Sequence, residues 1–192
     1  MRILTEDVRR FQTPVYSRVS RSSQTYNAVA RRCRTQLELL KAEYHAVVPE
    51  QEFDAGQVRR EIRIDMDVAL RRYHKYCIHQ RDGMLAHYHE IGADEDCDFE
   101  HLIPAKIIRD MYLFDEIDVD HVLNAPTVRL SRTKHVMLKD TGWDDDTPNI
   151  WLPFERYTNV FAATYQTHDG TAIDPLTWTL EKHYNYFEHL VI

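Results

Sequence analysis

Two long runs with a helical period limit what this chain can fold into. Between Ser23 and Pro49, apolar residues recur every three or four positions, at Val29, Cys33, Leu37, Leu40, Tyr44 and Val47. A second run keeps this period to about Gln80, at Val58, Ile62, Met66, Ala69, Tyr73 and Cys77. Such spacing places the apolar side chains on one face of a helix. We therefore expect two amphipathic helices packed as an antiparallel hairpin.

Local signals should mark the ends of this hairpin. Pro49 stops the first helix, and Asp82-Gly83 stops the second. Asp54 and Gln57 resemble a capping arrangement, in which the aspartate accepts first-turn amides and the glutamine reaches back. The residues before the first helix include Pro14 and show no clear period, which indicates an extended or poorly ordered arm.

After Gly83 the pattern changes to shorter units. The expected elements are a strand or short helix at 84–91, a strand at 99–103, a helix at 106–114, a strand at 127–130, a helix capped by Ser131 and running to Lys139, a helix at 154–165, and a last helix opened by Asp174-Pro175. This pattern predicts an α+β fold that is mostly helical. Residues 1–82 would form the arm and hairpin, and residues 83–192 would pack with them in one compact unit.

The composition supports a folded protein and excludes several classes. Its 192 residues are 43% hydrophobic and 11% aromatic, which suits one globular domain. No stretch approaches the ~18 apolar residues that span a bilayer, and the N-terminus lacks the apolar core of a signal peptide. We therefore expect a cytoplasmic protein without a membrane partner. The three cysteines form no C-x-x-C pair, so neither a disulfide framework nor a zinc knuckle is expected.

The net charge of -7 hides a division along the chain. Residues 1–81 hold 16 Lys/Arg against 10 Asp/Glu, whereas residues 82–192 hold 8 against 21. The basic half suggests a surface for the phosphate backbone of DNA. The candidate phosphate-binding residues on the second helix are Arg59, Arg60, Arg63, Arg71, Arg72 and Lys75. The alternative is that these side chains only solvate the helix and pair with nearby carboxylates.

A second group of polar residues could carry chemistry. Phosphodiester hydrolysis needs a base for the attacking water, a cation that stabilises charge on the phosphate, and a fixed geometry between them. Glu100-His101 offers a carboxylate beside an imidazole. Because neighbouring side chains of a strand point to opposite faces, a bulge or a strand end would have to bring the two together.

This segment resembles a known family. Phe99-Glu100-His101-Leu102-Ile103-Pro104, Leu123-Asn124-Ala125-Pro126-Thr127 and Leu130-Ser131-Arg132-Thr133-Lys134-His135 are similar to the acidic-His, Asn and His elements of HNH endonucleases. The resemblance covers about residues 96–140. It implies a ββα-metal segment between the hairpin and the C-terminal helices. It also implies that His101 is the general base, that Glu100 and His135 bind one divalent metal, and that Asn124 orients the loop.

The resemblance implies a metal-dependent DNA endonuclease or nickase. Mg²⁺ or Mn²⁺ is the first expectation for the cofactor, while a histidine ligand also admits Zn²⁺ or Ni²⁺. The alternative is a non-catalytic protein of a larger assembly or a homo-oligomer, with or without a degenerate HNH fold. Two other clusters stay open as metal sites, namely His87-Tyr88-His89-Glu90 and the group Asp118, Asp120 and His121. Phosphate-binding glycine loops, dinucleotide fingerprints and serine-hydrolase elbows are absent from the sequence.

Overall fold

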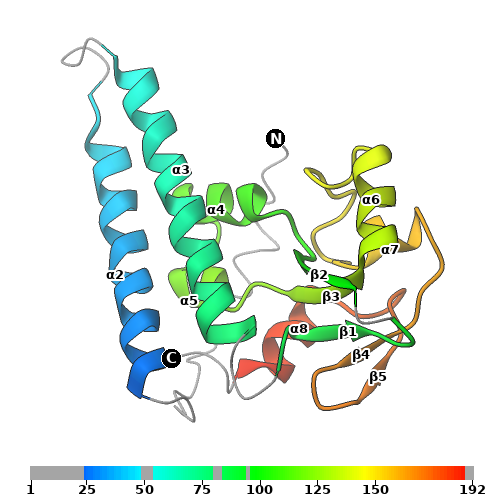
Figure 1. Cartoon of the computed structure of the whole chain (residues 1–192). Helices are drawn as coiled ribbons and strands as arrows, with labels where there is room; N and C mark the ends of the chain where they lie inside the picture. Colours follow the sequence, from blue (N-terminus) through cyan, green and yellow to red (C-terminus); the bar gives the residue numbers. More distant parts are fainter. Residues whose placement is uncertain (1–23, 49–53, 80–83, 94–95, 189–192) are drawn as a thin grey trace.

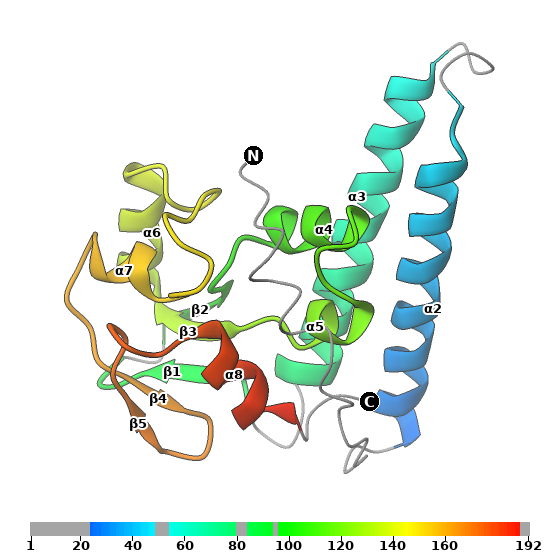
Figure 2. The same cartoon turned by 180° about the vertical axis from the view of Figure 1, so that it is seen from behind.

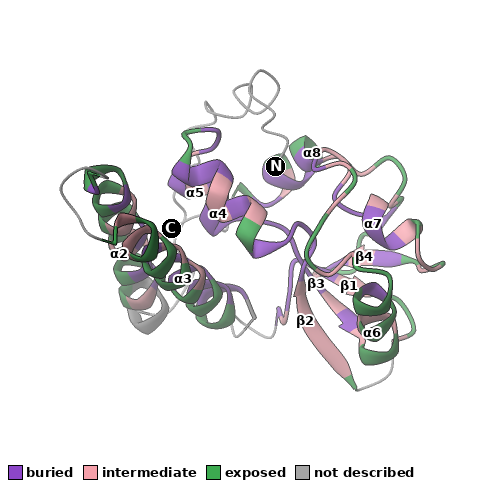
Figure 3. Cartoon of the chain, turned by 90° about the horizontal axis from the view of Figure 1, so that it is seen from above, coloured by how far each residue is buried: buried purple, intermediate pink, exposed green. Residues whose placement is uncertain are grey.

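The N-terminal half is a hairpin of two long helices. The computed structural model describes residues 24–48, 54–79, 84–93 and 96–188. Helix α2 (Gln24–Ala46) and helix α3 (Ala55–Tyr73) lie side by side (Figure 1), as the period of the sequence predicts. Their apolar positions are buried against each other, whereas their outer faces are exposed (Figure 3). The expected N-terminal arm lies outside the described residues.

The second helix begins differently from the expectation, and its expected stop at Asp82-Gly83 lies outside the described residues. Asp54 occupies the N-cap of α3, but its side chain makes no capping hydrogen bond, and Gln57 donates to Glu61 instead of reaching back. The predicted capping box is therefore wrong. Beyond Tyr73 the helix widens into a π-helical turn, η2 (His74–His79).

The second half is built on a five-stranded mixed sheet in the order β2-β3-β1-β4-β5. The strands are β1 (Tyr88–Glu90), β2 (Cys97–His101), β3 (Thr127–Ser131), β4 (Tyr165–Thr167) and β5 (Ala172–Ile173). Strand β3 pairs antiparallel with β2 and parallel with β1, and the remaining pairs are antiparallel. The strands expected at 99–103 and 127–130 are thus present, and the ambiguous segment 84–91 contains a strand.

Short helices connect and cover these strands. Helix α4 (Ala105–Leu113) and helix α5 (Val119–Leu123) are inserted between β2 and β3 and lie beside α3 (Figure 1). Helix α6 (Arg132–Asp140) follows β3 directly and packs on both β2 and β3. Strands β2 and β3 are thus antiparallel neighbours that α4 and α5 separate along the chain, and α6 covers both of them.

The C-terminal quarter contains less helix than its sequence suggests. Only α7 (Glu155–Thr158) forms within the predicted helix at 154–165, and the chain then enters β4 and β5. The last helix, α8 (Leu180–Tyr186), is capped by Thr179, whose side chain accepts from the amide of Lys182. Asp174 instead stabilises a turn by accepting from the amide of Leu176. The expected last helix is therefore present, but it starts at Leu180 and not at Asp174-Pro175.

A single cluster of buried apolar residues extends from the hairpin to the sheet. Helices α4 and α5 lie between the two parts and are mostly buried (Figure 3). The ion pair of Arg34 with Asp120 and the ion pair of Arg109 with Asp67 add polar links. On the far side, α8 lies beside the sheet (Figure 2), where His183 Nδ1 is 2.7 Å from the hydroxyl of Tyr88. Within the described ranges, none of the helices is both long and apolar enough to cross a membrane.

Candidate metal and phosphate site

A cavity of about 290 Å³ opens where the end of α3, the end of β2 and the helix α6 meet. Three residues expected from the sequence to act in catalysis or metal binding line it, namely Glu100, His101 and His135. The other lining residues are Arg71, Phe99, Pro104, Ala105, Lys106, Lys139, Asp144 and Asp145. The cavity thus brings together carboxylates, imidazoles and cationic side chains from segments far apart in the sequence.

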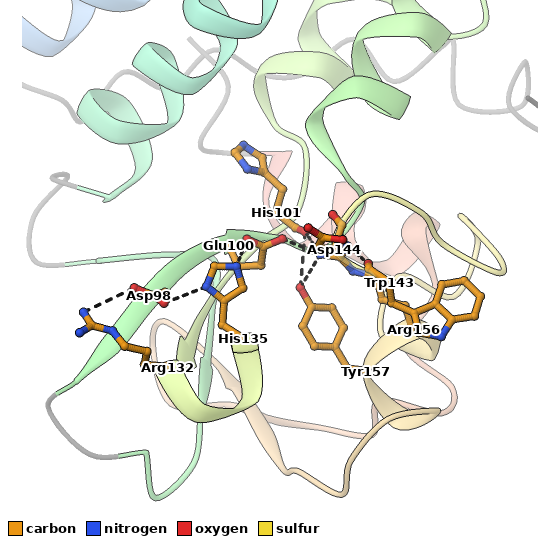
Figure 4. A network of polar contacts seen from close by, with 9 residues as sticks. All are labelled: Asp98, Glu100, His101, Arg132, His135, Trp143, Asp144, Arg156 and Tyr157. Carbon is orange, nitrogen blue, oxygen red and sulfur yellow. Dashed lines mark hydrogen bonds and ion pairs between the residues drawn. The ribbon is translucent and has the colours of Figure 1, made fainter. Parts of the chain in front are cut away.

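Two carboxylates of β2 face the helix α6. Asp98 and Glu100 are two residues apart on β2, so they project from the same face of the strand. His135 lies one turn into α6 and points back toward this face (Figure 4). Its Nδ1 is 2.8 Å from Oδ2 of Asp98, and its Nε2 is 3.4 Å from Oε2 of Glu100. The imidazole therefore lies between two carboxylates.

The contact with Asp98 determines what His135 can offer to Glu100. A carboxylate accepts a hydrogen bond, so Nδ1 of His135 must carry the proton that is shared with Asp98. In a neutral imidazole, Nε2 then presents a lone pair toward the negative oxygen of Glu100. Two acceptors that face each other at 3.4 Å are stable only with a proton or a cation between them.

The spacing fits a shared divalent cation. Two ligands bonded at roughly 2.0–2.2 Å, with an angle between about 90° and 110° at the ion, lie about 2.8–3.6 Å apart. The separation of 3.4 Å between Glu100 and His135 falls inside this range. Among the described residues, no group of three or more His, Cys, Asp or Glu side chains is arranged to hold a metal. The fit thus rests on one carboxylate and one imidazole, with the other positions left to water or substrate.

The start of α6 is held by Glu90, which the sequence suggested only as part of a candidate metal cluster. Ser131 occupies the N-cap position, but its side chain makes no capping hydrogen bond. Glu90 of β1 replaces it, because its carboxylate accepts from the amide of Ser131 at 2.9 Å and pairs with Lys134. Burial opposes the ionisation of Glu90, but these two partners outweigh it and lower its pKa. A negative side chain at this helix end is also favoured by the helix dipole.

Arg156 fixes the other oxygen of Glu100. Its guanidinium is fully buried and lies 2.7 Å from Oε1 of Glu100 (Figure 4). It also donates to the backbone carbonyls of His101 and Trp143. Arg156 therefore ties the end of β2 to the segment after α6, and it leaves Oε2 of Glu100 facing His135. A lone arginine in an aromatic-rich segment carries no sequence signal for this role.

His101 points away from Glu100 and His135 (Figure 4). The pairing of β2 with β3 is regular through Glu100 and His101, so no bulge turns their side chains to one face. Nε2 of His101 lies 2.7 Å from Nδ1 of His74 in η2. Burial, the nearby His74 and two arginines lower the pKa of His101 well below its usual value, so the imidazole is neutral at pH 7. Its ring borders the same cavity from the other side of the strand end.

Asn124 is buried behind the site and does not line the cavity. Its Oδ1 accepts from Nε2 of His87 at 3.1 Å, and its Nδ2 donates to the carbonyl of Phe187 at 3.1 Å. It thereby anchors the loop between α5 and β3. The neighbouring carbonyl of Leu123 lies 3.2 Å from Nε2 of His74, the residue that contacts His101. Asn124 is therefore connected to His101 through this loop and His74.

The six candidate phosphate-binding residues divide into two groups. Arg59 donates to the carbonyl of Val47 and Arg63 donates to the hydroxyl of Tyr44, so both are used within the hairpin. The side chains of the other four are exposed, namely Arg60, Arg71, Arg72 and Lys75. Of these, Arg71 lines the cavity, whereas Arg72 lines a groove on the outside of the hairpin together with Arg31 and Arg32.

The two other candidate metal clusters have structural partners. His87 is buried and bonded to Thr127 and Asn124, and His89 bonds to the carbonyl of Met84. Asp118 caps α5 and contacts the ring of His121, while Asp120 pairs with Arg34. These contacts give both clusters a structural role in the fold.

Comparisons with protein-family models, curated proteins and solved structures found no match for this chain. The resemblance of residues 96–140 to HNH endonucleases therefore remains a hypothesis based on the sequence alone.

Proposed function

We propose that this protein is a metal-dependent phosphodiesterase of the HNH type that cleaves DNA as an endonuclease or nickase. The observation that carries the proposal is the arrangement of Glu100, His135 and Asp98 on the ββα segment. Nε2 of His135 and Oε2 of Glu100 face each other at 3.4 Å, while Asp98 holds the opposite nitrogen of His135. That arrangement is what a carboxylate-imidazole pair needs to share a divalent ion.

Glu100 and His135 would hold the ion, which we expect to be Mg²⁺ or Mn²⁺, with Zn²⁺ or Ni²⁺ admitted by the imidazole ligand. Asp98 accepts from Nδ1 of His135 and so fixes the ring orientation and keeps Nε2 available. Arg156 fixes Glu100 in the same way by occupying Oε1. A divalent ion bound there would supply the positive charge that stabilises a phosphate as its bond to the leaving oxygen breaks.

His101 is the candidate general base. A neutral imidazole can accept a proton from the attacking water, and the lowered pKa keeps His101 neutral at pH 7. The ring borders the cavity that Glu100 and His135 also line. His101 is therefore expected to act on the water from the side opposite the ligand pair.

The phosphate would be held by cationic side chains around the cavity. Arg71 of α3, Lys106 of α4 and Lys139 of α6 line it from three elements. Lys106 is paired with Asp145 at 3.1 Å, and that pair is exposed enough for a phosphate to compete for the lysine. Because phosphate contacts carry little base information, this set favours binding of the DNA backbone over recognition of a sequence.

Plasmid cleavage tests the proposal. We expect the wild-type protein to nick or cut supercoiled plasmid with Mg²⁺ or Mn²⁺, and His101→Ala and Glu100→Gln to lose at least about 100-fold in rate, as for a missing acid-base or charge-stabilising group. His45→Gln, on α2, serves as the matched histidine control and should cleave normally, because glutamine can still donate to the carbonyl of Leu113 that His45 contacts. Equal cleavage by wild type and His101→Ala, or none with any divalent ion, would contradict the proposal.

The alternative is a degenerate HNH fold, and one contact of Glu100 supports it. Glu100 is the carboxylate partner of the fully buried Arg156, so it has a structural use without any metal. In that case the protein would bind a metal without cleaving DNA, or bind none, while Glu100→Gln would still lower stability. Measuring metal content and cleavage on the same preparation separates the two functions.

A further inference from the structure

The candidate base is held by a histidine from the N-terminal hairpin. His74 is the first residue of the π-helical turn η2, and its side chain is completely buried. Its Nδ1 lies 2.7 Å from Nε2 of His101, and its Nε2 lies 3.2 Å from the carbonyl oxygen of Leu123. The three groups form a chain of hydrogen bonds from the α5–β3 loop to the end of β2.

The positions of the protons along these hydrogen bonds follow from the group at one end, the carbonyl of Leu123. A backbone carbonyl can only accept, so Nε2 of His74 must donate to Leu123. Burial lowers the pKa of His74 to about 4, so its ring is neutral at pH 7 and its Nδ1 carries a lone pair. Nε2 of His101 must then donate to that lone pair. The neutral ring of His101 therefore has its own lone pair on Nδ1.

We propose that His74 is a positioning residue that locks His101 in the tautomer protonated at Nε2, so that Nδ1 is the atom offered to the cavity. Nε2 is occupied by a buried partner, whereas Nδ1 makes no hydrogen bond with any residue in the described part of the chain. The role of Nδ1 as the basic atom depends on the proposed function. The tautomer itself does not.

The end of α3 explains how the hairpin reaches this position. Arg71 on the last turn of α3 lines the cavity, and His74, three residues later, contacts His101. His74 keeps α-helical dihedral angles and stands where α3 passes into the π-helical turn. Such turns occur often at functional sites. One short segment of the hairpin would therefore supply both a phosphate contact and the support for the base.

The tautomer can be measured in the metal-free full-length protein. Long-range ¹H–¹⁵N correlation spectra of histidine-labelled protein at pH 7.5 report which ring nitrogen carries the proton, and the His101 signals are identified by their loss in His101→Ala. We expect one tautomer, protonated at Nε2, in the wild type and in the control His45→Gln. In His74→Phe we expect both tautomers to be populated. A wild-type ring protonated at Nδ1, or an unchanged tautomer in a folded His74→Phe, would overturn the proposal.

Cleavage kinetics provide the second readout. We expect His74→Phe to lower kcat by about 10-fold or more, while KM and the affinity for Mn²⁺ stay unchanged, because a base in the wrong tautomer cannot accept the proton. His74→Asn keeps an acceptor near the position of Nδ1 and should recover part of the rate. An equal loss in both variants, or a rise in KM alone, would contradict the positioning role. If the wild type proves inactive as a nuclease, the proposed function fails, while the spectra still decide the tautomer.

Discussion

Oδ2 of Asp98 lies 2.8 Å from Nδ1 of His135, and this contact turns the opposite nitrogen of the ring toward Glu100. A carboxylate that holds the distal nitrogen of a metal-binding histidine fixes its tautomer and raises its basicity. Asp98 was not among the residues selected from the sequence. Its position two residues before Glu100 on the same face of β2 makes it part of the same site.

Asp98→Asn should weaken metal binding. The asparagine amide can still contact His135, but it lacks the negative charge with which the carboxylate of Asp98 stabilises the protonated Nδ1. We therefore expect the affinity for Mn²⁺ to fall about 10- to 100-fold. Titration calorimetry measures this. Asp96→Asn is the matched control. Asp96 lies just before the same strand, and its exposed carboxylate pairs with Arg132 at 3.0 Å. Equal affinities of the two variants would argue against a metal on His135.

Arg156→Met should destabilise the protein strongly. It leaves the carboxylate of Glu100 and the carbonyls of His101 and Trp143 without their donor in a buried region. Removal of one partner of a buried ion pair costs about 3–5 kcal/mol. Urea unfolding measures this, with the exposed Arg60→Met as a control expected within about 0.5 kcal/mol of wild type. A loss below about 1 kcal/mol for Arg156→Met would show that Arg156 does not hold the end of β2.

Two neighbouring arginines should differ in their effect on DNA binding. Arg71 lines the cavity, whereas Arg72 lines a groove on the outside of the hairpin. We expect Arg71→Ala to weaken DNA binding and to lower the slope of log affinity against log salt by about 1, because one phosphate contact is lost. Arg72→Ala should leave both values unchanged. Fluorescence anisotropy at several salt concentrations measures this, and the opposite ranking would place the DNA on the outer face of the hairpin.

The stability of the protein should fall in mild acid. Burial lowers the pKa of His74 to about 4 and that of His183 to about 3, below the value of about 6.5 in an unfolded chain. The unfolded state therefore binds more protons between these values, so the free energy of unfolding is fully present above pH 6.5 and decreases as the pH falls toward 4. Urea midpoints at pH 7.5, 6, 5 and 4.5 measure this.

The variant His183→Gln should reduce the slope of stability against pH, because it removes one of the buried groups that must be protonated on unfolding in acid. His183 bonds to Tyr88 and to the carbonyl of Asn124, so the variant should also be less stable at pH 7.5. Asp169 contributes to stability at lower pH. Hydrogen bonds from Thr167 and Tyr186 lower its pKa to about 2, so its contribution is lost only as the pH falls toward that value. A stability that stays constant between pH 7.5 and 4.5 would contradict the account.

The parts of the fold that the sequence predicted correctly are those with a long period or a clear end signal. The helical hairpin contains many turns with the same spacing, and the strands 97–101 and 127–131 contain β-branched or aromatic residues beside clear breaks. The strands β4 and β5 were missed because they contain three and two residues, too few to show an alternation. The helix expected at 154–165 extends only from Glu155 to Thr158.

The candidate site was only partly predictable for a related reason. Glu100 and His135 were predictable because they lie on a strand and on the helix that follows the partner strand, and sequence patterns describe such elements well. The contacts of His101 with His74 and of Glu100 with Arg156 join residues 27 and 56 positions apart. Those contacts depend on how the hairpin and an irregular segment pack against the end of β2, which a periodic pattern does not encode.

Titration of the metal-free protein with Mn²⁺ tests the central claim most directly. If Glu100 and His135 share a divalent ion, the wild type should bind one Mn²⁺ per chain, and Glu100→Gln and His135→Ala should each lose about 100-fold or more in affinity. His101→Ala, whose altered ring points away from the ligand pair, should bind as the wild type does. Absence of binding by the wild type, or equal affinity in all four proteins, would contradict the account.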